Sequence, residues 1–389
     1  MKRTQLAQKL SLLSASKKPF EVSYLIGFDG FTDEILSCVK MRQDAENYEP
    51  IATIREFGER IVEAADKGTN FELVVKKTKI GGNGPILASA LATYGFLPTL
   101  IGALGFPEIE PLFQPLLQSC KKVFSLTSSG HTDALEFTDS KIILGKMHSI
   151  LQIDVDLLIK RIPEKELVLL FDEANIFVSA NWTMILGMTK IWKYLISTIL
   201  PQISVRAEQR QLFIDLADPA KRSDLDLQEA IITLADLSRF YTITLGLNEL
   251  EAKRIAHLFN HTIPVQDLGL SREKIVSLAA FIQSKTGFET IVIHTTKYAA
   301  ACTKDENIHV DGPFCKAPFL TTGGGDNFNA GFLFGRGLKL SLDECLLLAV
   351  ATSGYYIRVG KSPTIADLIS FLRSWDRDPL ELELLKIEC

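Results

Sequence analysis

The most chemically informative stretch of the chain is a glycine-rich run, residues 321–331, that leads into a helical pattern. Its three consecutive glycines, Gly323, Gly324 and Gly325, let the backbone curl so that several N–H groups point outward at the positive end of a helix dipole. Such a turn can bind an anion. Asp326 follows on the first helical turn, where its carboxylate could accept the proton of a hydroxyl that attacks a bound phosphate. The alternative is that Asp326 only caps the helix and that the glycines only form a tight turn.

A second candidate, residues 248–251, directly follows an apolar run and opens a helical pattern. Asn248 and Glu251 can orient waters around Mg²⁺, a hard cation that keeps much of its hydration while it bridges nucleotide phosphates. The same spacing is also a capping box, in which an Asn cap and a Glu three residues later satisfy free backbone N–H groups. Taken alone, the motif favours the capping box over the metal site.

Polar residues near the N-terminus follow the first apolar run. Asp29 and Asp33 flank the turn after this run, and a double-glycine segment with Gly82 and Asn83 precedes a helical pattern. Ligands of open α/β sheets bind beyond the carboxyl ends of the strands, so these side chains are well placed to hold the hydroxyls of a polyol. Either aspartate could instead be an exposed turn residue.

The rest of the chain alternates apolar runs typical of buried strands with stretches of helical periodicity. Strands are predicted over Val22–Gly27, Leu97–Gly102, Leu167–Asp172, Gln211–Asp215, Phe240–Leu245 and Thr290–His294. Helices are predicted over Pro85–Tyr94, Asn181–Leu200, Asp224–Leu237, Asn248–Phe259 and Arg272–Lys285. This alternation predicts an α/β fold with a mostly parallel central sheet that helices cover on both faces.

Two regions interrupt the alternation. Residues 130–148 predict an antiparallel hairpin, and the charged segment 33–79 contains a helix-like stretch, Ile54–Ala65, between extended pieces. Since no linker rich in Pro or Ser divides the chain, we expect one domain over residues 1–389, with 33–79 and 130–148 as lid or insertion segments within it.

The composition excludes several classes of partner. The formal net charge is −5, from 42 Lys+Arg against 47 Asp+Glu, so we expect neither a nucleic acid nor a membrane surface as a partner. Six widely spaced cysteines without a Cys-x-x-Cys pair fit reduced thiols in the cytoplasm. The N-terminal residues predict a short surface helix rather than a signal peptide, and no apolar run reaches the roughly 18 residues of a membrane span.

Motifs of other enzyme classes are missing from the sequence. It has no His-Glu-x-x-His, no Gly-x-Ser-x-Gly and no Gly-x-Gly-x-x-Gly, which argues against zinc hydrolases, serine hydrolases and NAD enzymes. Gly360-Lys361-Ser362 ends like a phosphate-binding loop, but Tyr355 stands where that loop needs its first glycine.

Four motifs together resemble those of the ribokinase-like (PfkB) carbohydrate kinases, and they occur in the family's order over most of the chain. Residues 321–331 resemble the family's C-terminal signature, and residues 248–251 resemble its Asn-x-x-Glu. Residues 81–84 resemble its N-terminal double glycine, and Asp218-Pro219 is similar to a fourth motif. The resemblance implies a central sheet flanked by helices, with a small β lid over the substrate.

The resemblance also implies a reaction and a role for each motif. The chain would transfer the γ-phosphoryl group of ATP, with Mg²⁺, to a hydroxyl of a sugar or sugar-like alcohol. Asp326 would be the catalytic base and Gly323–Gly325 the anion hole. The nucleotide would contact Asn248, Glu251, Thr295 and Thr322, with Glu251 and Asn248 acting on the metal, Asn248 through water. The sugar would contact Asp29, Asp33, Gly82 and Asn83.

Four positions depart from the family's pattern. Leu320 stands where an Asp commonly helps to form a monovalent-cation site, so potassium activation is not implied. Ile86 stands where an Asn usually contacts sugar, and Thr295 and Tyr298 replace two glycines near the nucleotide. The residues therefore leave an ADP-dependent sugar kinase and a non-catalytic sugar or nucleotide sensor as alternatives. Because the 33–79 segment is longer than expected, it could also form a subunit contact, such as a homodimer through the lid.

Overall fold

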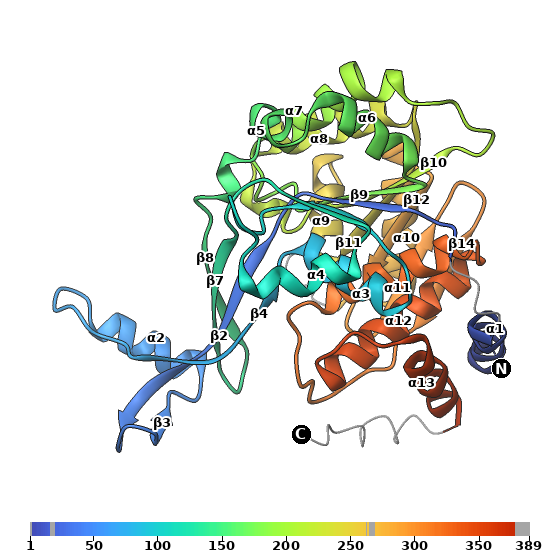
Figure 1. Cartoon of the computed structure of the whole chain (residues 1–389). Helices are drawn as coiled ribbons and strands as arrows, with labels where there is room; N and C mark the ends of the chain where they lie inside the picture. The colour runs from blue at the N-terminus through green and yellow to red at the C-terminus, as the bar shows by residue number, and fades with distance from the viewer. Residues whose placement is uncertain (1, 16–19, 262, 264–268, 378–389) are drawn as a thin grey trace.

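The computed structural model describes residues 2–15, 20–261, 263 and 269–377, which form two β-sheets and the helices around them (Figure 1). The larger sheet has nine strands in the order β14-β13-β12-β11-β10-β9-β1-β5-β6. Its strands are β1 (Tyr24–Gly27), β5 (Thr99–Gly102), β6 (Lys122–Ser125), β9 (Ile176–Ala180), β10 (Arg210–Asp215), β11 (Tyr241–Asn248), β12 (Thr290–His294), β13 (Tyr298–Cys302) and β14 (Asn307–Asp311). All pairings from β6 to β12 are parallel, and β13 and β14 add an antiparallel edge, which confirms the predicted sheet.

Helices cover both faces of this sheet, as the continuous apolar strands require. Successive side chains of a strand point to opposite faces, so Phe177 packs in one hydrophobic core and Val178 in the other. The first core is formed with α5 (Val155–Arg161), α6 (Glu164–Glu173), α7 (Met188–Tyr194), α8 (Asp224–Leu237), α9 (Glu249–Leu258) and α10 (Arg272–Thr286). The second is formed with α1 (Lys2–Ala15), α3 (Asn83–Thr93), α4 (Gln114–Ser119), α11 (Gly324–Gly337), α12 (Leu342–Val359) and α13 (Ile365–Arg377).

The predicted strand Leu167–Asp172 is wrong, because these residues lie in α6. Leu167, Leu170 and Phe171 recur at helical spacing and are buried, whereas Leu169 between them is 55% exposed. A strand buried on both faces would hide Leu169 as well. The strand of this region is β9, which follows α6 directly along the chain.

The predicted helix Asn181–Leu200 is only partly correct. Its α-helical portion is α7, which continues as a π-helical turn over Leu195–Ile199 and a 3₁₀ turn over Leu200–Gln202. Pro201 in that last turn has no backbone N–H to donate, so the regular helix cannot continue through it. The other predicted strands and helices are confirmed with small differences at their ends.

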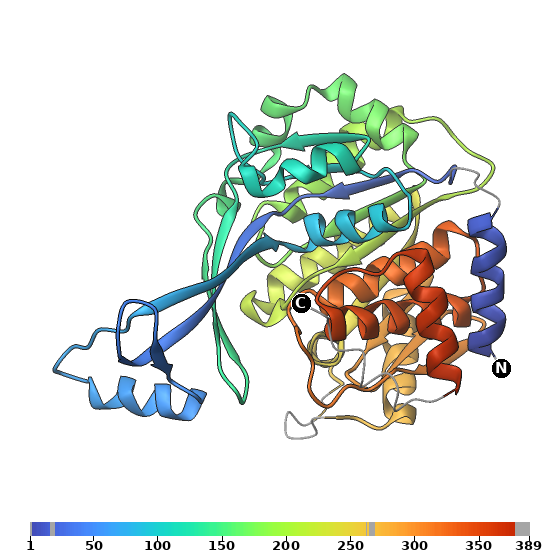
Figure 2. The ribbon, with the colours of Figure 1, turned by 60° about the horizontal axis from the view of Figure 1, so that its bottom comes forward.

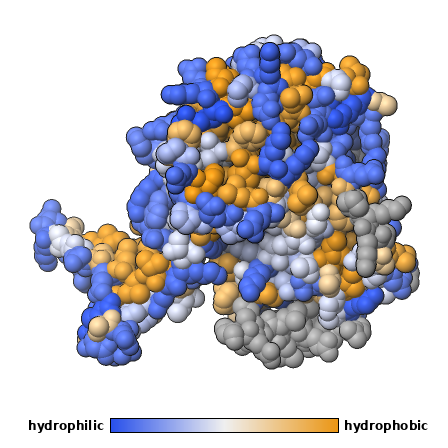
Figure 3. Space-filling model, viewed as in Figure 1, coloured by the Kyte–Doolittle hydropathy of each residue, from blue (hydrophilic) through white to orange (hydrophobic). Residues whose placement is uncertain are grey.

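The second sheet projects from the body of the molecule, at the left of Figure 1. Its strands are β2 (Phe31–Arg42), β3 (Tyr48–Pro50), β4 (Leu73–Gly81), β7 (Gly130–Glu136) and β8 (Lys141–Lys146), of which β7 and β8 form the predicted hairpin. The helix α2 (Ile54–Glu63) packs Phe57 into a small core with Leu36 and Leu135. Figure 3 shows apolar surface on this projection.

The N-terminal helix α1 lies beside α13, as Figure 2 shows. The Thr4 hydroxyl donates a hydrogen bond of 2.6 Å to Asp376 Oδ2, and Leu6 and Leu10 are buried between the helices and the core. The predicted surface helix is therefore confirmed. Among the described residues, no helix combines the length and the apolar character that crossing a membrane requires.

Candidate active site

The carboxyl ends of the central parallel strands bring together polar residues from distant parts of the sequence. Asp215, Asn248 and His294 are the last residues of β10, β11 and β12, and Asp29 lies just beyond the end of β1. The helix α11 begins nearby, because its Asn329 donates a hydrogen bond of 2.8 Å to Asp215 Oδ2. Ligands of open α/β sheets bind at this edge.

The glycine run forms the turn that the sequence predicts. Gly323 is the N-cap of α11 with a φ of 94°, and an added Cβ would lie 2.7 Å from the Tyr356 hydroxyl. Only glycine fits both constraints without strain. No side chain caps this helix. The Gly324 N–H donates a hydrogen bond of 3.1 Å to the Thr321 carbonyl, whereas the next N–H groups, those of Gly325 and Asp326, have no partner among the described residues and are available to an anion.

Asp326 lies on the first turn of α11 and is partly exposed. Gly323, not Asp326, occupies the N-cap, so capping does not account for this carboxylate. Among the described residues it forms no salt bridge with a Lys or Arg. Burial, followed by the charges of Asp215 and Asp29, raises its pKa well above the ordinary value, while Lys79 and a hydrogen bond with Asn83 oppose this shift. A raised pKa brings a carboxylate closer to the range in which a general base works best.

Asp29 is fully buried and holds the start of α3. Its carboxylate accepts hydrogen bonds from the backbone N–H of Asn83 (2.9 Å) and Gly84 (2.8 Å) and from Asn181 Nδ2 (2.9 Å). The preceding Gly82 has a φ of 86°, and an added Cβ would lie 2.9 Å from Gly30 Cα. This placement argues against the predicted contact of Asp29 with the sugar, because both of its oxygens already bind the protein.

Asp215 is a site residue that the sequence analysis missed. It accepts hydrogen bonds from Asn83 Nδ2 (3.3 Å), Asn329 Nδ2 (2.8 Å) and the backbone N–H of Ala217 (2.8 Å). Burial raises its pKa to about 6. The only signal in the sequence was its place at the end of a predicted strand. The side-chain oxygen of Asn329 is buried without a hydrogen-bond partner.

The second sheet contributes Asp33, Lys79 and Lys141 to the site. Asp33 is 5% exposed within β2, so the alternative of an exposed turn residue is wrong. Lys79 Nζ lies 3.9 Å from Asp33 Oδ2 and donates a hydrogen bond of 3.2 Å to the Thr322 carbonyl. Lys141 Nζ donates to the hydroxyls of Thr321 (2.9 Å) and Thr322. Both lysines were missed, because nothing in their local sequence marks them.

These two lysines are held close to each other beside the glycine turn. Burial lowers the pKa of Lys79, while the charge of Asp33 and that of Asp326 oppose this shift. Burial and the charge of Lys79 lower the pKa of Lys141. Two ammonium groups that repel each other in this way form a strong site for an anion with more than one negative charge.

Asn248 and Glu251 form the capping box of α9, as the simpler explanation predicts. The Glu251 backbone donates to Asn248 Oδ1 (2.9 Å), and the Asn248 backbone donates to Glu251 Oε2 (2.8 Å). Glu251 is also buried, and burial together with the charges of Asp215, Asp218 and Asp326 raises its pKa well above the ordinary value. A hard divalent cation fits this surplus of carboxylates, because oxygen ligands and negative charge are what Mg²⁺ prefers.

A cavity of ≈ 570 Å³ leads to the glycine turn from the side of α12. Gly324, Gly325 and Thr321 line one part of it, and its apolar lining includes Phe314, Phe328, Tyr298, Val350 and Ile357. This size and lining suit a purine base and ribose with phosphates at the glycine turn. His294 packs against Phe328 with ring centroids 4.7 Å apart, and burial lowers its pKa to about 4, so it lies there as a neutral ring.

Thr295 and Tyr298, which replace two glycines of the family's pattern, lie at the two ends of a turn that the Thr295 hydroxyl stabilises. Thr295 Oγ1 accepts hydrogen bonds of 3.1 Å from the backbone N–H groups of Lys297 and Tyr298. Neither residue has a positive φ, so the turn does not require glycine. Thr295 lines the cavity, whereas Thr322 does not and instead contacts Lys79, Lys141 and Tyr356.

The family model for prokaryotic ketohexokinases matches residues 13–375 of the chain. The chain belongs to the prokaryotic ketohexokinase family. Among curated proteins it is similar to the ketohexokinase of Haloferax volcanii, with 29% identity over 349 residues that cover 89% of this chain and 90% of the relative. This family membership makes the chain a carbohydrate kinase and confirms the resemblance on which the sequence analysis relied.

Two solved structures show the same fold at low sequence identity. Arabidopsis thaliana ribokinase complexed with ribose and ATP is 16% identical with a TM-score of 0.59, over 92% of this chain and 99% of the other. Ribokinase from Thermotoga maritima is 14% identical with a TM-score of 0.59, over 90% and 99%. The chain therefore has the ribokinase fold.

Proposed function

We propose that this protein transfers the γ-phosphoryl group of ATP, in the presence of Mg²⁺, to a hydroxyl of a ketohexose. The observation that carries the proposal is the position of Asp326, between the uncapped amides of the glycine turn and a polar cluster beyond the strand ends. The name of the Haloferax relative and that of the family support a ketohexose as the acceptor.

In the proposed reaction, the acceptor hydroxyl oxygen attacks the γ-phosphorus as the bond to the ADP oxygen breaks. Asp326 takes the hydroxyl proton, and the backbone N–H of Gly325 donates to an oxygen of the transferred group. The protein mainly positions the reactants and stabilises charge, because phosphoryl transfer passes through a loose transition state. Mg²⁺ would neutralise nucleotide phosphate charge, with Glu251 and Asn248 orienting its waters.

The lysine pair adds positive charge at the same place. Lys79 and Lys141 reach the loop before the glycine turn from the second sheet, which supports a place for them beside the proposed phosphate site. We assign them to the transferred phosphoryl group, whose negative charge they would share with the glycine amides.

On the sugar side, polar side chains come from Asp33 and Asn83. Asp33 can accept a hydrogen bond from a sugar hydroxyl from its place in β2. Asp29 holds Asn83 in place and acts as a positioning residue. The second sheet would then close over the sugar as a lid.

A phosphate-transfer assay with fructose and a panel of aldoses tests this function. We expect ketohexose phosphate to form with ATP and Mg²⁺. A second assay replaces ATP with ADP as the only nucleotide, to test ADP as the phosphoryl donor. Product with ADP alone would support the ADP-dependent alternative, and calorimetric binding of sugar without turnover would support the sensor.

We also propose that the second sheet forms the contact of a homodimer. Val62 of α2 and Val75 of β4 are 74% and 50% exposed, and apolar side chains of this kind favour a protein contact on a projecting element. Sedimentation of the wild-type protein and of the Val62→Lys variant tests the dimer, which the charge should weaken.

A further inference from the structure

A polar cavity of ≈ 330 Å³ lies at the amino ends of β9 and β10, at the opposite edge of the central sheet from the candidate active site. Arg336 belongs to the last turn of α11, about 15 Å from Asp326 at ~1.5 Å per helical residue. The charged residues that line the cavity are four cations and two carboxylates: Arg206, Arg210, Arg336, Lys339, Glu21 and Glu208.

Only two of the four cations that line this cavity form an ion pair with a carboxylate among the described residues. Lys339 pairs with Glu208 at 2.6 Å, and Arg210 pairs with Asp172 Oδ1 at 2.6 Å. Arg336 donates only to the Gln211 side-chain oxygen, at 3.1 Å, within the described part of the chain.

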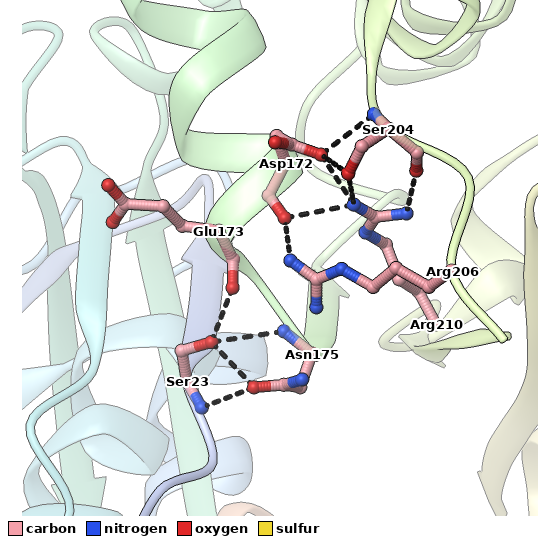
Figure 4. Close-up of polar contacts among 7 residues, drawn as sticks. All are labelled: Ser23, Asp172, Glu173, Asn175, Ser204, Arg206 and Arg210. Atoms are coloured by element: carbon pink, nitrogen blue, oxygen red, sulfur yellow. Dashed lines mark hydrogen bonds and ion pairs between the residues drawn. The ribbon is translucent and has the colours of Figure 1, made fainter. Parts of the chain in front are cut away.

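Two arginines lie side by side at the end of α6, as Figure 4 shows. Arg206 and Arg210 both donate to the Asp172 carbonyl, and Arg206 has no carboxylate partner among the residues described. Arg210 is only 6% exposed, and its Nε is buried without a hydrogen-bond partner. Burial and the charge of Arg206 lower the pKa of Arg210. The positive charge gathered here is therefore not balanced by the protein itself.

We propose that this cavity is a binding site for a small polyanion of the phosphate-ester or diphosphate class, held by Arg206, Arg336 and Lys339. A guanidinium group can donate two hydrogen bonds to phosphate oxygens, and the side-chain amide of Asn175 adds a neutral donor to the lining. The volume admits a small metabolite and excludes a macromolecule. Such a ligand would contact α11 and β10, the two elements that carry Asp326 and Asp215 at their other ends.

Pyrophosphate is the probe that tests this site, with the full-length protein in Mg²⁺-free buffer. Calorimetry gives its affinity, and hydrogen exchange locates the protected backbone amides. We expect protection over 204–211 and 333–339, in addition to any protection at the glycine turn. The Arg206→Gln variant should weaken binding at this cavity about tenfold, the effect of one lost charge-assisted hydrogen bond.

A second variant keeps the test valid if Arg206→Gln fails to fold. Lys339→Gln changes a side chain that is 68% exposed at the rim, and it should weaken the same binding event several-fold. Lys165→Gln, an exposed change on α6 outside the cavity, should leave affinity unchanged. Protection confined to 321–328, or equal pyrophosphate affinity in all variants, would overturn the proposal.

Discussion

Lys141 of the projecting sheet donates a hydrogen bond of 2.9 Å to the hydroxyl of Thr321, two residues before Gly323 of the glycine turn. This contact joins the second sheet to the loop that leads into the glycine turn, across a long separation in sequence. Lys79 donates to the Thr322 carbonyl of the same loop, so the second sheet places two ammonium groups beside the glycine turn.

The lysine pair leads to the first prediction. Replacing Lys79 or Lys141 with Met should lower kcat about 10²-fold, because a preorganised positive group beside the transferred phosphoryl group is lost. Ketohexose affinity should change much less. Steady-state kinetics with saturating ATP measures both.

The matched control is Lys77→Met, an exposed lysine two residues before Lys79 on the same strand. It should keep wild-type kcat. A loss of kcat as large in Lys77→Met as in Lys79→Met would mean that the whole strand, and not the buried ammonium group, matters.

A second prediction concerns the glycine turn. Gly323→Ala should reduce both stability and ATP affinity, since the φ of 94° strains a side chain and the new Cβ lies 2.7 Å from the Tyr356 hydroxyl. We expect a loss of about 1–3 kcal/mol in the free energy of unfolding, measured by chemical denaturation.

Gly68→Ala is the control for Gly323→Ala, because it introduces backbone strain away from the candidate site. Gly68 also has a positive φ, 72°, but nothing lies within 4 Å of an added Cβ. This variant should lose about 1 kcal/mol of stability and no ATP affinity. If both variants bind ATP equally well, the glycine turn does not hold the nucleotide.

The buried carboxylates predict how stability depends on pH. The folded pKa of Asp215 is raised to about 6, so its protonated form favours folding. That stabilisation is fully present below the unfolded pKa of about 3.9, and it is lost as the pH rises through about 6. As the pH rises from 4 to 7, the free energy of unfolding of the wild type should therefore fall by about 1–3 kcal/mol relative to that of the Asp215→Asn variant, which has no carboxylate at this position.

Added Mg²⁺ should restore part of the stability that is lost when the buried carboxylates ionise. A divalent cation stabilises the ionised carboxylates, so it should raise Tm more at pH 7 than at pH 5, where Asp215 is largely protonated. Thermal melts at the two pH values provide the measurement. An equal rise in Tm at both pH values would contradict a metal site among these residues.

The sequence predicts the local parts of this site well and the long-range parts poorly. Asp326 and the glycine turn follow from residues adjacent in the chain, and so does the capping box of Asn248 and Glu251. Lys79 and Lys141 reach the site only through the fold of the second sheet, and neither lies in a motif.

Two further differences have the same physical origin. The run Leu167–Asp172 is apolar enough for a strand, and its helical identity depends on which of its residues the neighbouring helices bury. Asp29 was predicted to hold sugar, but its neighbours in space, Asn181 and the start of α3, already bind both oxygens. Partners distant in the chain decide both outcomes.

The most direct test of the account is the kcat of Asp326→Asn with fructose and ATP. We predict a fall of about 10²–10⁴-fold, the range for a lost general base, with the fold intact and ATP affinity within a few-fold of wild type. Asp305→Asn, in the exposed turn between β13 and β14, serves as the control and should keep full activity. Wild-type kcat in Asp326→Asn would contradict the assignment of this carboxylate as the base.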